Sequence, residues 1–212
     1  MSEQPVRAEQ AEHDFPGKGK VVAIRTRPQK VLEDVGAAMN QAGAEELFKG
    51  QPEVVIKTVL GSTGWLAGTS TSPWQLEGAV RYLQAEGVKR LIAAQDRSQV
   101  KQVYQAENNN KLTYVFDKYS VEDLHLDEPE VEWTIYEPKA DMLVLHQVYP
   151  EGVEIPKFLI GKPLVELPAL EAGAMAAAAG YLAVGLRAFA HDQFDRALVD
   201  LLTIQREIHP AL

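Results

Sequence analysis

The chain has 212 residues, 46% of them hydrophobic, and a formal net charge of −9. It contains no cysteine, which excludes disulfide frameworks, thiolate metal sites and iron–sulfur clusters held by its own residues. The acidic excess repels phosphate backbones and anionic membranes, so we expect neither nucleic acid nor a membrane as a partner.

The sequence predicts a polar N-terminal arm followed by one folded domain. Residues 1–19 are mixed in charge and lack the apolar run of a signal peptide, so we expect a flexible arm and a cytoplasmic protein. Residues 20–212 show no internal repeat and no linker-like stretch, and their number suits a single domain.

Predicted strands and helices alternate through the first half of this domain. Apolar, β-branched runs predict strands over residues 20–25, 53–60 and 88–94. Apolar residues at helical spacing predict a helix over residues 31–47, and a further helix is expected after the third strand. This order predicts an α/β fold with a mainly parallel, Rossmann-like sheet and helices on both faces.

The clearest helix start in the sequence lies near residue 72. Ser72 is the expected N-cap, Pro73 suits the first helical position, and Gln75 completes a capping box. Gly87 is placed to end this helix.

The middle of the chain has a less regular pattern. The Asn108–Asn110 run predicts a turn, and residues 112–116 predict a strand. Seven carboxylates and no lysine or arginine occupy residues 122–137. Alternating polar and apolar residues from position 130 to 135 indicate an edge strand with one face exposed to solvent. Calcium-loop spacing is absent, which favours a solvated face over a cation site.

The C-terminal section is predicted to be mainly helical. Residues 141–145 indicate one more short strand before it. Residues 172–186 are uncharged and rich in alanine, and they predict a buried helix over residues 172–190 whose apolar part is too short to span a bilayer. Residues 193–202 predict a last amphipathic helix.

Ligands of parallel α/β sheets bind outside the carboxyl ends of the strands. There the sequence places a lysine, a loop rich in glycine and hydroxyl residues, and a helix N-terminus, which together suit a carboxylate or phosphate. The loop lacks the Walker A and dinucleotide spacings, so a purely structural crossover stays open as the alternative. The predicted ligand-binding residues are Lys57, Ser62, Thr63, Thr69, Ser70, Thr71, Asp96 and Arg97.

Asp96 and His191 are the candidate catalytic residues. Asp96 either orients a substrate or caps the helix that follows it. His191 and Asp195 are four residues apart and would share a helix face, as a base with its orienting group or as a surface ion pair. Signatures of common hydrolases and zinc enzymes are absent, and we predict no metal and no cofactor.

A series of short motifs occurs in a fixed order along the chain: Ile56-Lys57, Thr71-Ser72-Pro73, Glu86-Gly87, Asp96, Leu167-Pro168, His191 and residues 195–200. Their order resembles that of the uncharacterised family called domain of unknown function 362. The resemblance implies a degenerate polar site, because the stretch from Pro168 to Ala172 lacks the family's lysine and histidine. It also implies a shortened C-terminus, and the lack of cysteine excludes the family's iron–sulfur version.

Two functions follow as expectations. The first is a non-catalytic interaction or scaffold module, in which the predicted helix over residues 172–190 packs against a second copy in a homo-oligomer. The alternative is an enzyme that acts on a small anionic metabolite, a carboxylate or phosphate, at the carboxyl ends of the strands.

Overall fold

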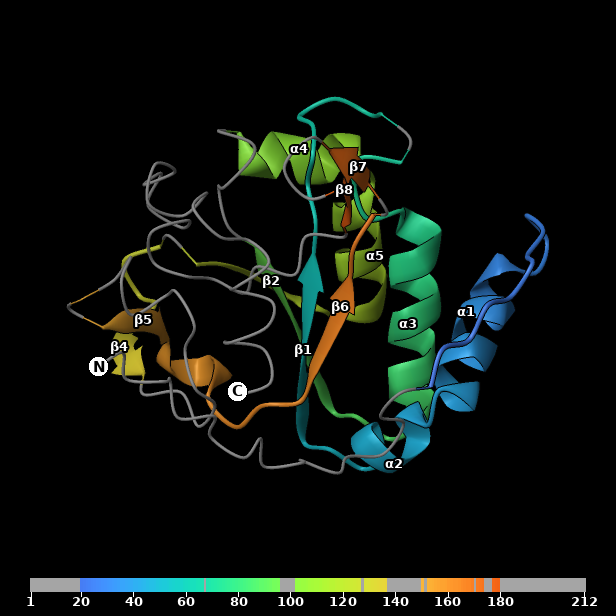
Figure 1. The fold of residues 1–212 in the computed structure, drawn as a ribbon, viewed down its shortest axis with the longest axis horizontal. Helices are drawn as coiled ribbons and strands as arrows, with labels where there is room; N and C mark the ends of the chain where they lie inside the picture. Colours follow the sequence, from blue (N-terminus) through green and yellow to red (C-terminus); the bar gives the residue numbers. More distant parts are fainter. Residues whose placement is uncertain are drawn as a thin grey trace, which may run out of the picture.

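The computed structural model describes residues 20–66, 68–95, 102–126, 128–136, 150, 152–169, 171–173 and 177–179. A sheet of four strands forms its centre, in the order β3-β2-β1-β6, and each neighbouring pair is parallel (Figure 1). These strands are β1 (Glu53–Thr58), β2 (Arg90–Gln95), β3 (Glu122–His125) and β6 (Leu164–Leu167). The predicted α/β class and the mainly parallel sheet are confirmed.

The helices contribute to one apolar cluster that covers the first face of the sheet. They are α1 (Val31–Gln41), α2 (Ala44–Phe48), α3 (Pro73–Ala85), α4 (Val103–Asn109) and α5 (Leu112–Tyr119). Ile56 of β1 and Ala93 of β2 lie in this cluster together with Leu76 and Leu83 of α3. Alternate residues of a strand point to opposite faces, so the second face carries the residues between them.

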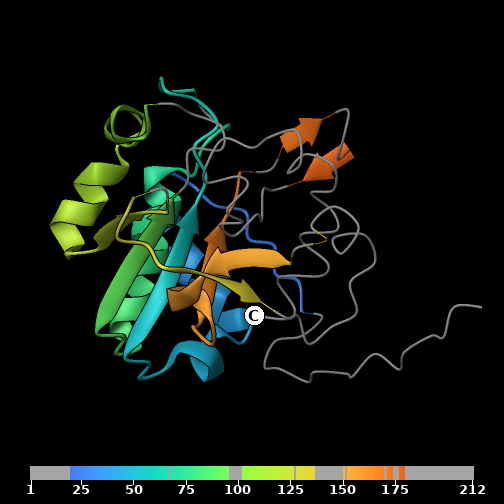
Figure 2. The same ribbon diagram turned by 90° about the vertical axis from the view of Figure 1, so that its left-hand side faces the viewer.

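That second face is covered differently. Val55 of β1 packs in a separate cluster with Leu126 and Leu159, against which Trp133 also lies. The covering elements are β4 (Trp133–Tyr136), β5 (Val153–Pro156) and the 3₁₀ helix η1 (Lys157–Leu159), and β4 pairs antiparallel with β5 (Figure 2). A strand pair and one 3₁₀ turn thus occupy the described part of the face where α-helices were predicted.

The predicted N-cap and first residue of α3 are confirmed. The Ser72 hydroxyl accepts a hydrogen bond from the Gln75 backbone N–H at 3.1 Å, and Pro73 is the first helical residue. Beyond the other end, Gly87 has φ +85°, a conformation that glycine adopts without strain.

Four local predictions need correction. Residues 20–25 form no strand, and Val21 is 93% exposed. The helix predicted over residues 31–47 divides at Gly43, whose φ is +93°. Residues 112–116 belong to helix α5, because Leu112, Val115 and Phe116 have the i, i+3, i+4 spacing that buries one helical face.

The fourth correction concerns the predicted alanine-rich helix over residues 172–190. Its described part contains two short antiparallel strands, β7 (Glu171–Gly173) and β8 (Ala177–Ala179). The backbone N–H and C=O groups of alanine can form hydrogen bonds in a strand as well as in a helix. The small side chains of these alanines do not favour either conformation through packing. The predictions over residues 1–19, 141–145 and 193–202 lie outside the described residues.

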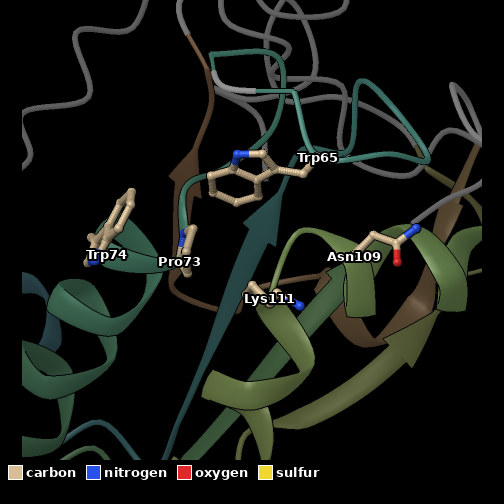
Figure 3. A pocket seen from close by; sticks show the side chains of 5 residues that line it. All are labelled: Trp65, Pro73, Trp74, Asn109 and Lys111. Carbon is tan, nitrogen blue, oxygen red and sulfur yellow. The ribbon is translucent and has the colours of Figure 1, made fainter.

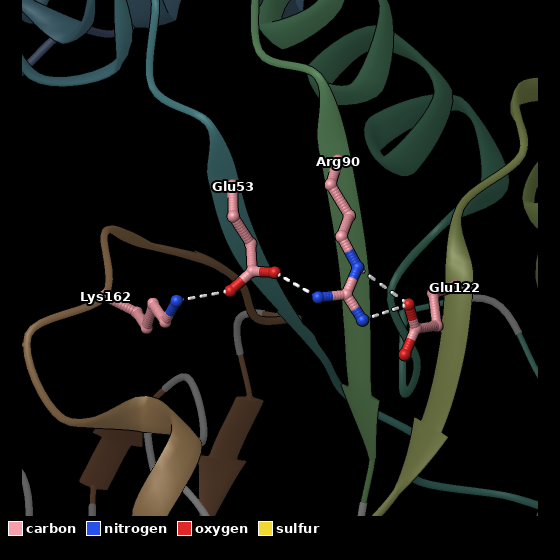
Figure 4. A network of polar contacts seen from close by, with 4 residues as sticks. All are labelled: Glu53, Arg90, Glu122 and Lys162. Atoms are coloured by element: carbon pink, nitrogen blue, oxygen red, sulfur yellow. Dashed lines mark hydrogen bonds and ion pairs between the residues drawn. The ribbon is translucent and has the colours of Figure 1, made fainter.

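A charged network joins the four parallel strands at their amino ends (Figure 4). Glu53, Arg90 and Glu122 are the first residues of β1, β2 and β3, and Lys162 precedes β6. Arg90 pairs with Glu53 and, at 2.6 Å, with Glu122, while Lys162 pairs with Glu53 at 2.6 Å. The hydrogen bond from Lys162, aided by Arg90 and opposed by burial, lowers the pKa of Glu53.

Because the pKa of Glu53 is lowered, the contribution of this residue to the free energy of unfolding depends on pH. A depressed carboxyl pKa stabilises the fold above the unfolded-state value, about 4.3, and the contribution is lost as the pH falls through the folded-state value. We expect Glu53→Gln to lower the free energy of unfolding by about 1 kcal/mol at pH 7 and by clearly less at pH 3. Urea unfolding at both pH values measures this, with exposed Glu130→Gln as the charge-matched control. Equal effects of the two variants at pH 7 would contradict the prediction.

Candidate functional site

The loop that follows β1 is fastened at the carboxyl end of that strand. Thr71 and Val59 exchange two hydrogen bonds of 2.8 Å, one of them through the Thr71 hydroxyl. The same hydroxyl donates to the carbonyl of Leu167 at the end of β6. The Gly61 N–H donates to the Ser70 hydroxyl at 3.2 Å. These contacts hold together the two ends of the loop that connects β1 with α3.

Two asparagines at the end of α4 hold the tip of this loop. The side-chain amide of Asn109 donates to the Thr63 carbonyl at 3.0 Å, and that of Asn110 donates to the Ser62 carbonyl at 3.1 Å. Asn110 is buried. The sequence predicted only a turn at residues 108–110. The hydrogen bonds show that two of these asparagines also position the loop.

A pocket of about 560 Å³ lies between the loop, the start of α3 and the α4–α5 junction (Figure 3). Its lining residues are Trp65, Pro73, Trp74, Asn109 and Lys111. The Trp65 and Trp74 side chains are 49% and 52% exposed, and their rings meet edge to face with centroids 6.4 Å apart. Pockets of this volume hold small organic ligands.

The electrostatic character of the pocket opposes that of the whole chain. Pro73 and Trp74 form the first turn of α3, which contains no acidic residue, and the amino end of a helix carries partial positive charge. Lys111 stands at the junction of α4 and α5 with φ +64°, and it adds a full positive charge to the lining. A protein of net charge −9 therefore presents a locally positive, aromatic pocket at the carboxyl edge of its sheet.

The predicted anion-binding hydroxyls lie in the loop beside this pocket, and several already bond to the protein. Ser70 and Thr71 fasten the loop as described above, and the Thr69 hydroxyl donates to the Leu66 carbonyl at 2.9 Å. Ser62 and Thr63 contribute backbone carbonyls to the asparagine contacts. Their assignment to a ligand stays a prediction.

Lys57 does not join this group. The strand register places it beside Ala94 and Glu166, on the sheet face opposite to Ile56 and α3. Its ammonium group donates to the Thr58 carbonyl at 3.0 Å and is buried. The remaining candidates, Asp96, Arg97 and His191, lie outside the described residues.

A second polar cluster sits at the carboxyl end of β3. His125 is 3% exposed, and its Nε2 atom lies 3.0 Å from Glu107 Oε1 and 3.5 Å from Asp123 Oδ1. Burial alone would lower the pKa of His125, but the hydrogen bonds with Asp123 and Glu107 outweigh it and raise this pKa to about 10.

The sequence prediction of a solvated acidic face missed this cluster. Asp123 and His125 are two residues apart on one strand, so they share a face, and that spacing was the available signal. Glu107 comes from α4, eighteen residues earlier, and no local pattern connects it with them.

In the part of the chain that the structure describes, no helix combines the length and apolar character needed to cross a bilayer. The resemblance to domain of unknown function 362 stays a prediction. Comparison with models of known protein families, with curated proteins and with solved structures finds no match to this chain.

Proposed function

We propose that this chain binds a small anion with a flat aromatic ring, such as an aromatic carboxylate or phosphate, in the pocket beside α3. The observation that carries the proposal is the combination of two half-exposed tryptophans with Lys111 at the start of a helix. The ligand class is that of the enzyme for small anionic metabolites expected as the alternative function, but binding alone is proposed here, with the positive charge supplied by Lys111 in place of Lys57.

Each part of the lining supports a different part of such a ligand. An aromatic ring packs against the exposed surface of Trp65 or Trp74, where aromatic contacts add about 0.5–1.5 kcal/mol beyond the area that they bury. The anionic group lies toward Lys111 and the first turn of α3, where charge and helix dipole both favour it. Asn109 fixes the loop that carries Trp65, so the ring surface is formed before the ligand arrives.

An interaction module, which the sequence analysis expects at residues 172–190, is the competing function, and the surface around the pocket offers a second place for it. Leu66 is 57% exposed next to Trp65, and an apolar patch of this kind can also dock a protein. The locally positive charge favours the small anion, because an apolar docking patch needs no lysine at its centre. The self-association expected through residues 172–190 stays a prediction, because only residues 172–173 and 177–179 of that range are described, and these form the short strands β7 and β8.

Isothermal titration with benzoate and phenyl phosphate, and with neutral benzamide as the comparison, tests the proposal. We expect both anions to bind more tightly than benzamide, and Lys111→Met to weaken anion binding about tenfold, which corresponds to about 1.4 kcal/mol. Lys89→Met removes an exposed lysine at the amino edge of the sheet and is expected to change nothing.

Equal binding by the Lys111 and Lys89 variants would contradict the proposal. Trp74→Ala separates the two functions. Loss of anion binding in a monomer supports the ligand site, whereas dissociation of an oligomer without any anion binding supports the interaction module.

A further inference from the structure

We infer that Glu107, Asp123 and His125 form a binding site for a divalent transition-metal ion, with Zn²⁺ as the probe. This site is separate from the aromatic pocket and does not depend on the function proposed for it. One imidazole nitrogen and one oxygen from each carboxylate, all within 4.8 Å of one another, would provide three protein ligands.

The distances between these atoms suit a small tetrahedral ion. Ligand atoms about 2.0–2.1 Å from a tetrahedral Zn²⁺ lie about 3.3 Å from one another. In the structure, His125 Nε2 is 3.0 Å from Glu107 Oε1 and 3.5 Å from Asp123 Oδ1, which brackets that separation. The third pair, the Glu107 and Asp123 oxygens, lies within 4.8 Å, so the two carboxylates would have to approach each other by at most about 1.5 Å to coordinate one ion.

The three ligand atoms, one nitrogen and two oxygens, indicate which class of metal ion the site would bind. Imidazole nitrogen is a ligand for zinc and its transition-metal neighbours, whereas Mg²⁺ and Ca²⁺ favour sites made of oxygen alone. A metal ion binds imidazole in its neutral form and displaces the proton, so the bound site would carry a ligand charge of −2, which one divalent cation balances. Glu107 and His125 are 1% and 3% exposed, so they would hold the ion away from bulk water, while the 29% exposed Asp123 leaves a path for entry.

A further carboxylate lies on the opposite side of the imidazole. His125 Nδ1 is 3.6 Å from Glu128 Oε1, a distance typical of an ion pair but too long for a hydrogen bond. The Glu128 carboxylate accepts a 2.6 Å hydrogen bond from the Tyr104 hydroxyl. The Tyr104 ring packs edge to face on the imidazole, with ring centroids 4.2 Å apart. If Glu128 moved closer by about 0.5 Å, Nδ1–H could donate a hydrogen bond to it, and such a bond orients a metal-bound histidine.

A buried amide next to the cluster independently indicates a missing partner. Gln95 is the register partner of His125 across the β2–β3 pair, so both side chains lie on the same sheet face. Gln95 is 1% exposed, and its Nε2 atom has no hydrogen-bond partner in the described structure. Buried N–H donors are rarely left without an acceptor. A water molecule in the fourth position of the metal ion could supply that acceptor if it lay on the Gln95 side of the cluster.

Titration of the full-length, chelator-treated protein with ZnCl₂, followed by calorimetry, tests the site. We expect one ion per chain and binding at least about tenfold weaker in Asp123→Asn, which keeps the shape of a side chain that is already partly exposed. Exposed Glu130→Gln makes the same charge change on the same acidic segment and is expected to bind like the parent protein. Co²⁺ should give visible absorption of tetrahedral strength in the parent protein and lose it in Asp123→Asn.

Circular dichroism melting in metal-free buffer checks that each variant folds, and Glu107→Gln replaces Asp123→Asn if the latter does not. Equal Zn²⁺ affinity in the parent protein and the folded ligand variant, or no saturable binding of one ion, overturns the inference. Benzoate titration of the same variants keeps the two sites distinct, because Asp123→Asn should leave binding in the aromatic pocket intact.

Discussion

Gly61→Ala is expected to lower the free energy of unfolding by about 3 kcal/mol and to abolish binding in the aromatic pocket. A Cβ atom at position 61 would lie 2.2 Å from the backbone carbonyl oxygen of Thr69, far inside van der Waals contact. A flexible side chain could turn away, but a backbone oxygen moves only with the loop, and the loop carries Trp65.

Gly64→Ala is the matched control in the same loop. A Cβ atom at position 64 meets nothing within 4 Å, so we expect a change within about 0.5 kcal/mol and unchanged anion affinity. Urea unfolding and benzoate titration of both variants measure the two effects. If Gly61→Ala proved as harmless as Gly64→Ala, the tight approach of residues 61 and 69 would be refuted.

The second large effect is expected where α1 crosses α3. A Cβ atom added at Gly78 of α3 would lie 2.7 Å from Val35 Cβ and 3.1 Å from the Leu32 carbonyl oxygen of α1. Both atoms belong to or adjoin the α1 backbone, so the helices must separate. We expect Gly78→Ala to lower the free energy of unfolding by about 2 kcal/mol, despite the better helix propensity of alanine.

Gly36→Ala, on the α1 side of the same contact, is expected to have the opposite sign. Its Cβ atom would approach Tyr82 Cδ2 at 3.5 Å, an ordinary contact, and alanine is favoured over glycine within a helix by about 1 kcal/mol. Thermal or urea unfolding of the two single variants gives the comparison. The same sign for both would show that the α1–α3 approach is looser than described.

The sequence was sufficient to predict those elements whose conformation depends mainly on residues that are close together in the chain. Strand β1 is mainly apolar on both faces, as expected for a strand buried between two layers. At the start of α3, the Ser72 hydroxyl accepts a hydrogen bond from a backbone N–H group only three residues away. Helix α5 was mistaken for a strand because its β-branched and aromatic residues have strand propensity. Burial of Leu112, Val115 and Phe116 against the sheet decided the outcome.

The candidate sites were harder to predict because they depend on register and on distant contacts. A lysine at the end of β1 was expected to face the ligand, but alternation along the strand turns Lys57 to the other face. Lys111 enters the pocket only because α4 and α5 meet beneath the loop. The Gln95–His125 pairing depends on how β2 and β3 align, and no short motif records that alignment.

The edge-to-face tryptophan pair also makes the pocket visible to spectroscopy. Trp65 and Trp74 are two of the three tryptophans in the chain, and the third, Trp133, packs partly buried on the far face of the sheet. Emission that aqueous acrylamide quenches should therefore come mainly from the pocket. Two indoles 6.4 Å apart and nearly perpendicular also couple their electronic transitions, so an exciton band in circular dichroism would report directly on the shape of the loop.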